Sequence, residues 1–208
     1  GKLSIWPNIL KTSKKQVAFI DNLDSFSWNI INELSINGAN VCLIPGRDIK
    51  GPKFDEIIKE LNPTHIVLGP GPGNPNISEL TMEIAKKSLS GGYPPLLGIC
   101  LGHQAIGVAA GWEINKTLTG AVHGEVHKIE NIGSSLFDFE NKMTRYHSLS
   151  LIKPKKDSKL KVVAKLANNE DSVMAIEHEI FPIFGVQFHP ESEESEGGEK
   201  IFEKFLKY

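Results

Sequence analysis

The stretch Gly98-Ile99-Cys100-Leu101-Gly102-His103-Gln104 places a cysteine between two glycines, after the apolar run 93–97 and ahead of a helix-like run. This is the G-x-nucleophile-x-G pattern of a nucleophile elbow, a tight strand-to-helix turn, with Cys where many hydrolases carry Ser. Small flanking residues avoid clashes at the strained turn, and the following helix aims its first N–H groups at the sulfur. Because free Cys is often simply a small core residue, the stretch predicts catalysis only if partners exist elsewhere in the chain.

A nucleophilic cysteine needs a base, and the base needs a group that orients it. The segment Gln187-Phe188-His189-Pro190-Glu191-Ser192 offers both. We expect a strand over 183–188, ending near Pro190, on which side chains two apart share a face. His189 and Glu191 then point the same way, which predicts a triad with Cys100. The alternative is a surface histidine at a strand end beside a solvated glutamate.

A third motif, Leu68-Gly69-Pro70-Gly71-Pro72-Gly73-Asn74-Pro75, directly follows the strand-like run 64–67. Alternating Gly and Pro free some φ angles and fix others, so that the loop can present backbone N–H groups to an anion. The sequence predicts the amides of Gly71 and Leu101 as donors of an oxyanion hole. The alternative is an ordinary tight loop, which is what Gly/Pro clusters usually form.

The order of elements predicts an α/β fold with a mostly parallel central sheet and helices on both faces. Apolar periodicity and helix-end signals indicate alternating strands and helices in the first half: strands 17–20, 40–44, 65–68 and 96–99, and helices 24–37, 53–61, 78–88 and 102–110. After Trp112 we expect a small antiparallel region and a closing helix: strands 126–129, 160–166, 173–176 and 183–188, and helix 198–206. In such folds the site lies beyond the carboxyl ends of the strands.

Composition narrows the class of protein. A chain of 208 residues suits one domain, and a net charge of −2 without a basic stripe argues against nucleic acid. Two cysteines give no disulfide framework, and Cys42, in an apolar run, reads as a small core residue. No apolar run is long enough for a membrane span and no secretory signal stands out, so we expect a cytoplasmic protein. The acidic run 191–196 reads as a solvated loop.

Several ordered motifs together resemble the class I (triad) glutamine amidotransferases. They are the elbow at 98–104, the Gly/Pro loop at 70–73, Arg145-Tyr146-His147-Ser148-Leu149 and the segment 187–192. Asp21-Asn22-Leu23-Asp24-Ser25-Phe26 narrows the resemblance to the glutaminase component of anthranilate synthase or aminodeoxychorismate synthase. The resemblance defines a glutamine amidotransferase domain over 16–208, preceded by an N-terminal extension or linker over 1–15.

The resemblance implies that L-glutamine is hydrolysed to glutamate through Cys100, His189 and Glu191, with neither cofactor nor metal. The implied partner is a chorismate-using synthase subunit, to which the ammonia would pass. The resemblance also implies that glutamine is held by two backbone segments and one amide side chain: Gly71, Pro72 and Gly73, Ser148 and Leu149, and Gln104. A plain surface amide is the alternative for Gln104, and Tyr146 and His147 receive no catalytic role.

This chain departs from the family pattern at one loop. It has His123-Gly124-Glu125 where the family usually has His-Gly-Lys, and Ala121 where Pro is common. The change to Glu125 reverses a charge on a possible partner-facing loop and bears on partner identity more than on the triad. Three alternatives stay open: a related cysteine hydrolase or chaperone, a non-catalytic regulatory binding subunit, and the glutaminase subunit of another amidotransferase pathway. The sequence predicts neither which aromatic product is made nor an oligomeric state.

Overall fold

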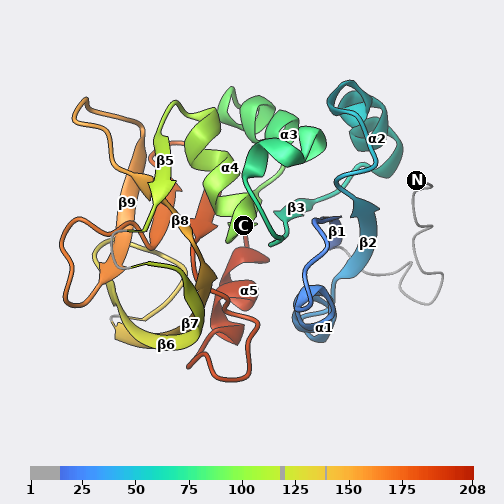
Figure 1. The fold of residues 1–208 in the computed structure, drawn as a ribbon. Coiled ribbons are helices and arrows are strands. Elements are labelled where there is room, and N and C mark those ends of the chain that lie inside the picture. Colours follow the sequence, from blue (N-terminus) through green and yellow to red (C-terminus); the bar gives the residue numbers. More distant parts are fainter. Residues whose placement is uncertain (1–14, 118–119, 139) are drawn as a thin grey trace.

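The computed structural model describes residues 15–117, 120–138 and 140–208 (Figure 1). Apart from Lys15, the N-terminal extension expected over 1–15 lies outside the described residues. The rest forms an α/β fold around one large sheet, as the sequence predicts.

Nine strands of the described chain form this sheet, in the order β2-β1-β3-β4-β11-β10-β9-β6-β7. Its first part is parallel: β2 (Asn40–Pro45), β1 (Gln16–Asp21), β3 (His65–Leu68), β4 (Leu96–Ile99) and β11 (Ile183–Val186). The remaining pairs are antiparallel: β10 (Ala175–His178), β9 (Leu160–Leu166), β6 (Val122–Asn131) and β7 (Glu140–His147). A separate antiparallel pair joins β5 (Glu113–Lys116) to β8 (Leu149–Ile152).

The parallel strands follow the sequence expectation closely, because their buried apolar runs are unbroken. The antiparallel part differs more. Strands β5, β7 and β8 are not predicted. β5 and β8 bury few side chains, and the buried residues of β7 include the polar Thr144, Arg145 and His147. The strand expected at 173–176 is displaced to Ala175–His178. The strand expected at 183–188 ends at Val186 and runs parallel to β4, so it belongs to the parallel part and not to the antiparallel region.

Helices cover both faces of the sheet (Figure 1). On one face, α1 (Ser27–Ile36) and α5 (Glu199–Phe205) bury Ile30, Leu34 and Phe202. On the other lie α2 (Phe54–Leu61), α3 (Glu79–Leu89) and α4 (Leu101–Ala109), and short 3-10 turns η2 (Gly51–Lys53) and η3 (Pro75–Ile77) precede two of these helices. Each fully buried Leu, Ile or Phe contributes about 1.5–3 kcal/mol of hydrophobic stabilisation.

Capping groups set the helix starts. The Oγ of Ser78 accepts the Thr81 N–H at 3.3 Å, so α3 begins one residue later than the helix expected at 78. The helix expected from 24 begins at Ser27 instead. Asp24 accepts the Phe26 N–H at 2.8 Å, and this turn holds 24–26 outside the helix.

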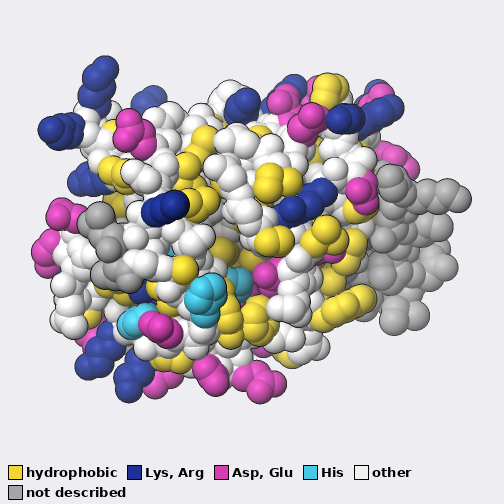
Figure 2. All heavy atoms as spheres, viewed as in Figure 1, with side chains coloured by type: hydrophobic (Ala, Val, Ile, Leu, Met, Phe, Trp, Pro, Cys, Tyr) yellow, Lys and Arg dark blue, Asp and Glu magenta, His cyan; other side chains and the backbone are white. Residues whose placement is uncertain are grey.

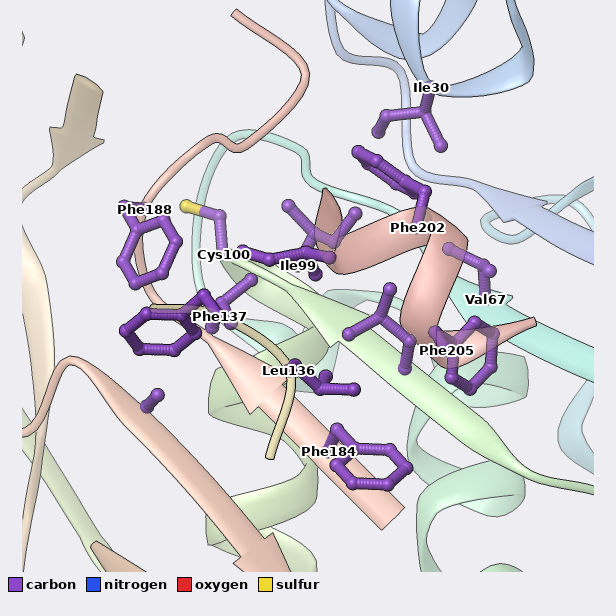
Figure 3. Close-up of a cluster of buried hydrophobic side chains, with 14 of the residues drawn as sticks. Ile30, Val67, Ile99, Cys100, Leu136, Phe137, Phe184, Phe188, Phe202 and Phe205 are labelled. Atoms are coloured by element: carbon purple, nitrogen blue, oxygen red, sulfur yellow. The ribbon is translucent and has the colours of Figure 1, made fainter. Parts of the chain in front are cut away.

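The carboxyl ends of β1, β3, β4 and β11 meet at one edge of the sheet, because the four strands are parallel. The segments that follow them carry Asn22, Gly71, Cys100 and His189. Figure 3 shows Cys100 at one end of a buried cluster, beside Ile99 and Phe188. The core of the sheet therefore ends where the predicted site begins.

Candidate active site

The chain turns sharply at Cys100, which has φ 54° and ψ −99°. The flanking glycines are required by close backbone approach. A Cβ on Gly98 would lie 2.5 Å from the Gly102 carbonyl, and one on Gly102 would lie 2.2 Å from the Leu68 oxygen. Leu101 is the first residue of α4, so its N–H has no acceptor within the helix. The turn thus has the geometry of a nucleophile elbow.

His189 and Glu191 form a buried pair. Nδ1 of His189 lies 2.7 Å from Oε1 of Glu191, and the two side chains are 1% and 0% exposed. The strand expected over 183–188 ends earlier, because β11 stops at Val186. His189 forms an isolated bridge with Thr144, and Glu191 lies in the turn that follows.

Contacts with β7 hold this bent segment in place. The His189 N–H donates to the Thr144 carbonyl at 2.8 Å. Ser195 donates its hydroxyl to the His189 carbonyl at 2.6 Å and accepts the Thr144 N–H at 3.0 Å. Ser195 is buried, so the run 191–196 is not the fully solvated loop that its charges indicate.

The structure brings Cys100 together with this pair, because the Cys100 side chain lies close enough to His189 to raise the pKa of the imidazole. Burial lowers the pKa of His189, but the Glu191 charge and the hydrogen bonds to Cys100 and Glu191 outweigh it and hold that pKa well above its ordinary value. With Nδ1 engaged by Glu191, Nε2 is the ring nitrogen left for the sulfur. The arrangement can accept a proton from the thiol.

A cavity of about 270 Å³ opens in front of the thiol. Every residue predicted to bind substrate lines it: Gly71, Pro72, Gly73, Gln104, Ser148 and Leu149. Val122, His123, Tyr146 and His147 also line it, of which Tyr146 and His147 receive no role from sequence. Its walls come from the segments after β3 and β4, from the start of β6 and from the end of β7 with the residues that follow it.

The buried Asn22 side chain holds the Gly/Pro loop in place. Its Nδ2 donates to the Gly69 carbonyl and to Thr81 Oγ1, both at 3.1 Å, and the residue is fully buried. A Cβ on Gly71 would lie 2.2 Å from the Asn22 oxygen. Only glycine fits there, which sets the backbone of Gly71 next to the cavity.

Two aromatic residues enclose the imidazole. The rings of Phe26 and Tyr146 each lie 5.5 Å from the His189 ring, and Tyr146 meets it edge-on at 86°. The Cys100 thiol also donates to the Tyr146 carbonyl at 3.5 Å. Sequence reasoning missed these roles, although Phe26 lies in one of the quoted motifs.

Gln104 is 2% exposed, so it is not the plain surface amide offered as an alternative. Its Nε2 donates to the Leu149 carbonyl at 3.0 Å and to Gln187 Oε1 at 3.2 Å. Gln187 in turn donates from Nε2 to Cys100 Sγ at 3.5 Å. No signal in the sequence marks Gln187 beyond its place two residues before His189.

The described residues hold no group of three His, Cys, Asp or Glu side chains suited to a metal ion. Within the same residues, no helix is both long and apolar enough to cross a membrane. On the face drawn in Figure 2, Lys and Arg side chains are scattered among Asp and Glu.

Known proteins resemble this chain along most of its length. The profile of the family "Glutamine amidotransferase class-I" matches residues 18–208. An anthranilate synthase component 2 from Saccharolobus solfataricus is 36% identical, over 90% of this chain and 95% of that protein. An aminodeoxychorismate synthase component 2 from Serratia marcescens is 35% identical, over 90% and 97%. The bifunctional protein TrpGD of Thermotoga maritima is 37% identical over 92% of this chain, which spans 32% of that protein.

A solved structure has the same architecture. It is a protein from Thermoplasma acidophilum, assigned to a GMP synthase, and it superimposes with a TM-score of 0.74 over 93% of this chain and 92% of its own. At 23% sequence identity, this likeness shows the fold alone.

Proposed function

The chain belongs to the class-I glutamine amidotransferase family, and from that premise we propose that it is a glutaminase subunit with Cys100 as nucleophile. One observation carries the proposal: Cys100 and all the predicted glutamine-binding residues line one cavity, and the buried His189–Glu191 pair lies beside the Cys100 side chain. The substrate is L-glutamine, and the products are glutamate and ammonia.

The first half of the reaction transfers the acyl group to sulfur. His189 takes the thiol proton while the Cys100 sulfur attacks the side-chain carboxamide carbon of glutamine. The amides of Gly71 and Leu101 hold the resulting oxyanion, at about 3 kcal/mol for each well-placed donor. The carbon–nitrogen bond then breaks, and His189 gives its proton to the departing ammonia.

The second half regenerates the thiol. Water, deprotonated by His189, attacks the thioester carbonyl and the carbon–sulfur bond breaks, which releases glutamate. Glu191 stays ionised throughout, fixes the imidazole and balances its positive charge. Gln104, Ser148, Leu149 and the loop 71–73 hold the amino-acid end of glutamine. No step uses a metal or a cofactor.

The proposed partner is a chorismate-using synthase subunit that receives the ammonia. The names of the relatives support this, since both are second components of such synthases. Two side chains at the cavity expose apolar surface that a partner could cover. Ile77, next to Gly73, is 52% exposed, and Tyr146 is 39% exposed. Figure 2 shows hydrophobic side chains gathered beside histidines on this face. A cytoplasmic setting is part of the proposal, because a reducing compartment keeps the free Cys100 thiol available.

The test is glutamate and ammonia release by the purified chain, alone and mixed with the synthase subunit for either anthranilate or aminodeoxychorismate. We expect hydrolysis that one or both partners stimulate, and the aromatic product identifies the branch. Hydrolysis that neither partner stimulates would assign the chain to another amidotransferase pathway. No hydrolysis with any partner would favour a non-catalytic regulatory subunit.

A further inference from the structure

A hydrogen bond reaches the Cys100 sulfur from a buried side chain that does not line the substrate cavity. Gln187 Nε2 lies 3.5 Å from Sγ, and Gln187 is fully buried one residue beyond β11. The thiol itself has one proton, which it can give to the Tyr146 carbonyl or to His189. When that proton leaves, the amide of Gln187 remains as a donor to the sulfur.

The direction of the Gln187 amide is fixed by its neighbours. Gln104 lies 3.0 Å from the Leu149 carbonyl, which only accepts, so the group facing it must be the Gln104 NH₂. The same NH₂ lies 3.2 Å from the Gln187 amide, so the oxygen of Gln187 faces Gln104. The NH₂ of Gln187 is then left for the sulfur. A flip of either amide would set two acceptors, or two donors, against each other.

The hydrogen bonds continue from Leu149 to His147 and Arg145, and we call these three residues, together with Gln104 and Gln187, the relay. The Arg145 guanidinium group can only donate. Its Nε lies 3.1 Å from His147 Nε2, which must therefore be the unprotonated ring nitrogen. The ring proton is on Nδ1, which donates to the Leu149 carbonyl at 2.9 Å. Burial, followed by the Arg145 charge, lowers the pKa of His147 to about 4, so the ring stays neutral. All five residues of the relay except Leu149 are buried.

We propose that Gln187 stabilises the Cys100 thiolate by donating a hydrogen bond to the sulfur, and that Gln104 fixes the direction of that donor. His147 and Arg145 are positioning residues, which hold the Leu149 carbonyl to which Gln104 donates. The inference rests on the proposed function, because it assigns roles within the same nucleophile site. It gives the Arg145–Leu149 motif a task besides holding glutamine: the motif orients the nucleophile through two amide side chains.

The test measures how fast iodoacetamide alkylates Cys100 as a function of pH, with the Cys100 peptide followed by mass spectrometry. Gln187→Leu removes the donor. Gln187→Glu has nearly the same shape and still accepts from Gln104, but it places a carboxylate against the sulfur. Both should move the midpoint of the profile to higher pH and slow alkylation at neutral pH about tenfold, with the larger effect in Gln187→Glu.

The matched control is Phe184→Leu on β11, which loses ring contacts with Phe205 and Tyr208 but touches none of the relay residues. It should lower thermal stability and leave the alkylation profile unchanged. If Gln187→Leu does not fold, Gln187→Glu and Gln104→Met carry the test. Wild-type profiles in folded variants of Gln187 overturn the proposal.

The positioning role of Arg145 has a separate test. Arg145→Met should shift the profile in the same direction, and it should add little to Gln187→Leu, because both act through one donor. A fully additive shift overturns the positioning role of Arg145.

Alkylation is independent of glutamine turnover. A wild-type chain without glutaminase activity would defeat the proposed function, whereas unshifted profiles in an active enzyme would defeat only the relay.

Discussion

His189 Nδ1 lies 2.7 Å from Glu191 Oε1 although neither residue belongs to a strand. The pair is set by a bend after β11, which Thr144 and Ser195 hold through the His189 backbone. The Glu191 side chain is fully buried, so water does not screen its negative charge. The adjacent His189 imidazole balances that charge when it is protonated.

Replacing Glu191 with Gln should slow glutamine hydrolysis less than Cys100→Ala does, because Glu191 orients the base and does not bond to substrate. We expect the loss in kcat/KM to be smaller by about two orders of magnitude, as for the orienting acid of other triads. Steady-state glutamate release measures both. A loss in Glu191→Gln as deep as that in Cys100→Ala would argue against a purely orienting role.

Cys100→Ala should abolish glutamine hydrolysis while the protein stays folded, because the nucleophile is lost and a small side chain is kept. Cys42→Ala is the matched control, since Cys42 is a fully buried residue of β2 in the other core cluster. It should reduce the unfolding temperature and leave the rate near that of wild type. Glutaminase activity retained in Cys100→Ala would refute the nucleophile assignment.

Gly102→Ala should disrupt the elbow, because the added Cβ would lie 2.2 Å from the Leu68 oxygen. We expect a loss of more than about 3 kcal/mol of stability, or no folded protein at all. Gly92→Ala is the control: it has a positive φ of 85° but no atom within 4 Å, so it should cost only about 1–2 kcal/mol. Chemical denaturation compares them, and equal losses would contradict the close-packing argument.

Acid should destabilise the protein through two buried neutral histidines. Burial lowers the pKa of His103 to about 3, and burial with the Arg145 charge lowers that of His147 to about 4. Both folded values lie below the unfolded value of about 6.5, so the unfolded chain binds protons first. Stability is therefore complete above about pH 6.5 and falls toward pH 4, by about 2 kcal/mol for each histidine at pH 5.

The measurement is the free energy of unfolding from denaturant curves at neutral and acid pH. His103→Leu should reduce the dependence on pH by about 2 kcal/mol, even if its stability at neutral pH changes. An unchanged dependence would show that His103 is not held neutral in the folded state.

Ile77→Glu should weaken stimulation by a synthase subunit while leaving the basal glutaminase rate intact. Ile77 is 52% exposed and borders Gly73 at the edge of the cavity, where a partner would bury it. Ile180→Glu is matched to it, being 61% exposed on the loop between β10 and β11, which enters β11 at the end opposite to His189. The titration of activity with partner should shift only for Ile77→Glu. Equal shifts would place the interface elsewhere.

The sequence alone predicts the local parts of this protein well. Short runs of neighbouring residues predict the elbow around Cys100, the loop around Gly71 and the parallel strands. In such runs a glycine or an apolar stretch favours one local structure. Strands β7 and β8 are missed because apolar and polar residues alternate poorly along them. The His189–Glu191 pairing is predicted from a strand that ends earlier than expected, at Val186.

What the sequence determined by itself is which residues could react, because spacing and residue type limit the chemistry of short motifs. What only the tertiary structure decided is what surrounds them: Asn22 beneath the Gly/Pro loop, the Tyr146 carbonyl on the thiol, and Gln187 behind the sulfur. Gln187 is 87 residues from Cys100, and they meet because β11 pairs with β4. Such contacts depend on which strands become neighbours, and local periodicity carries no information about that order.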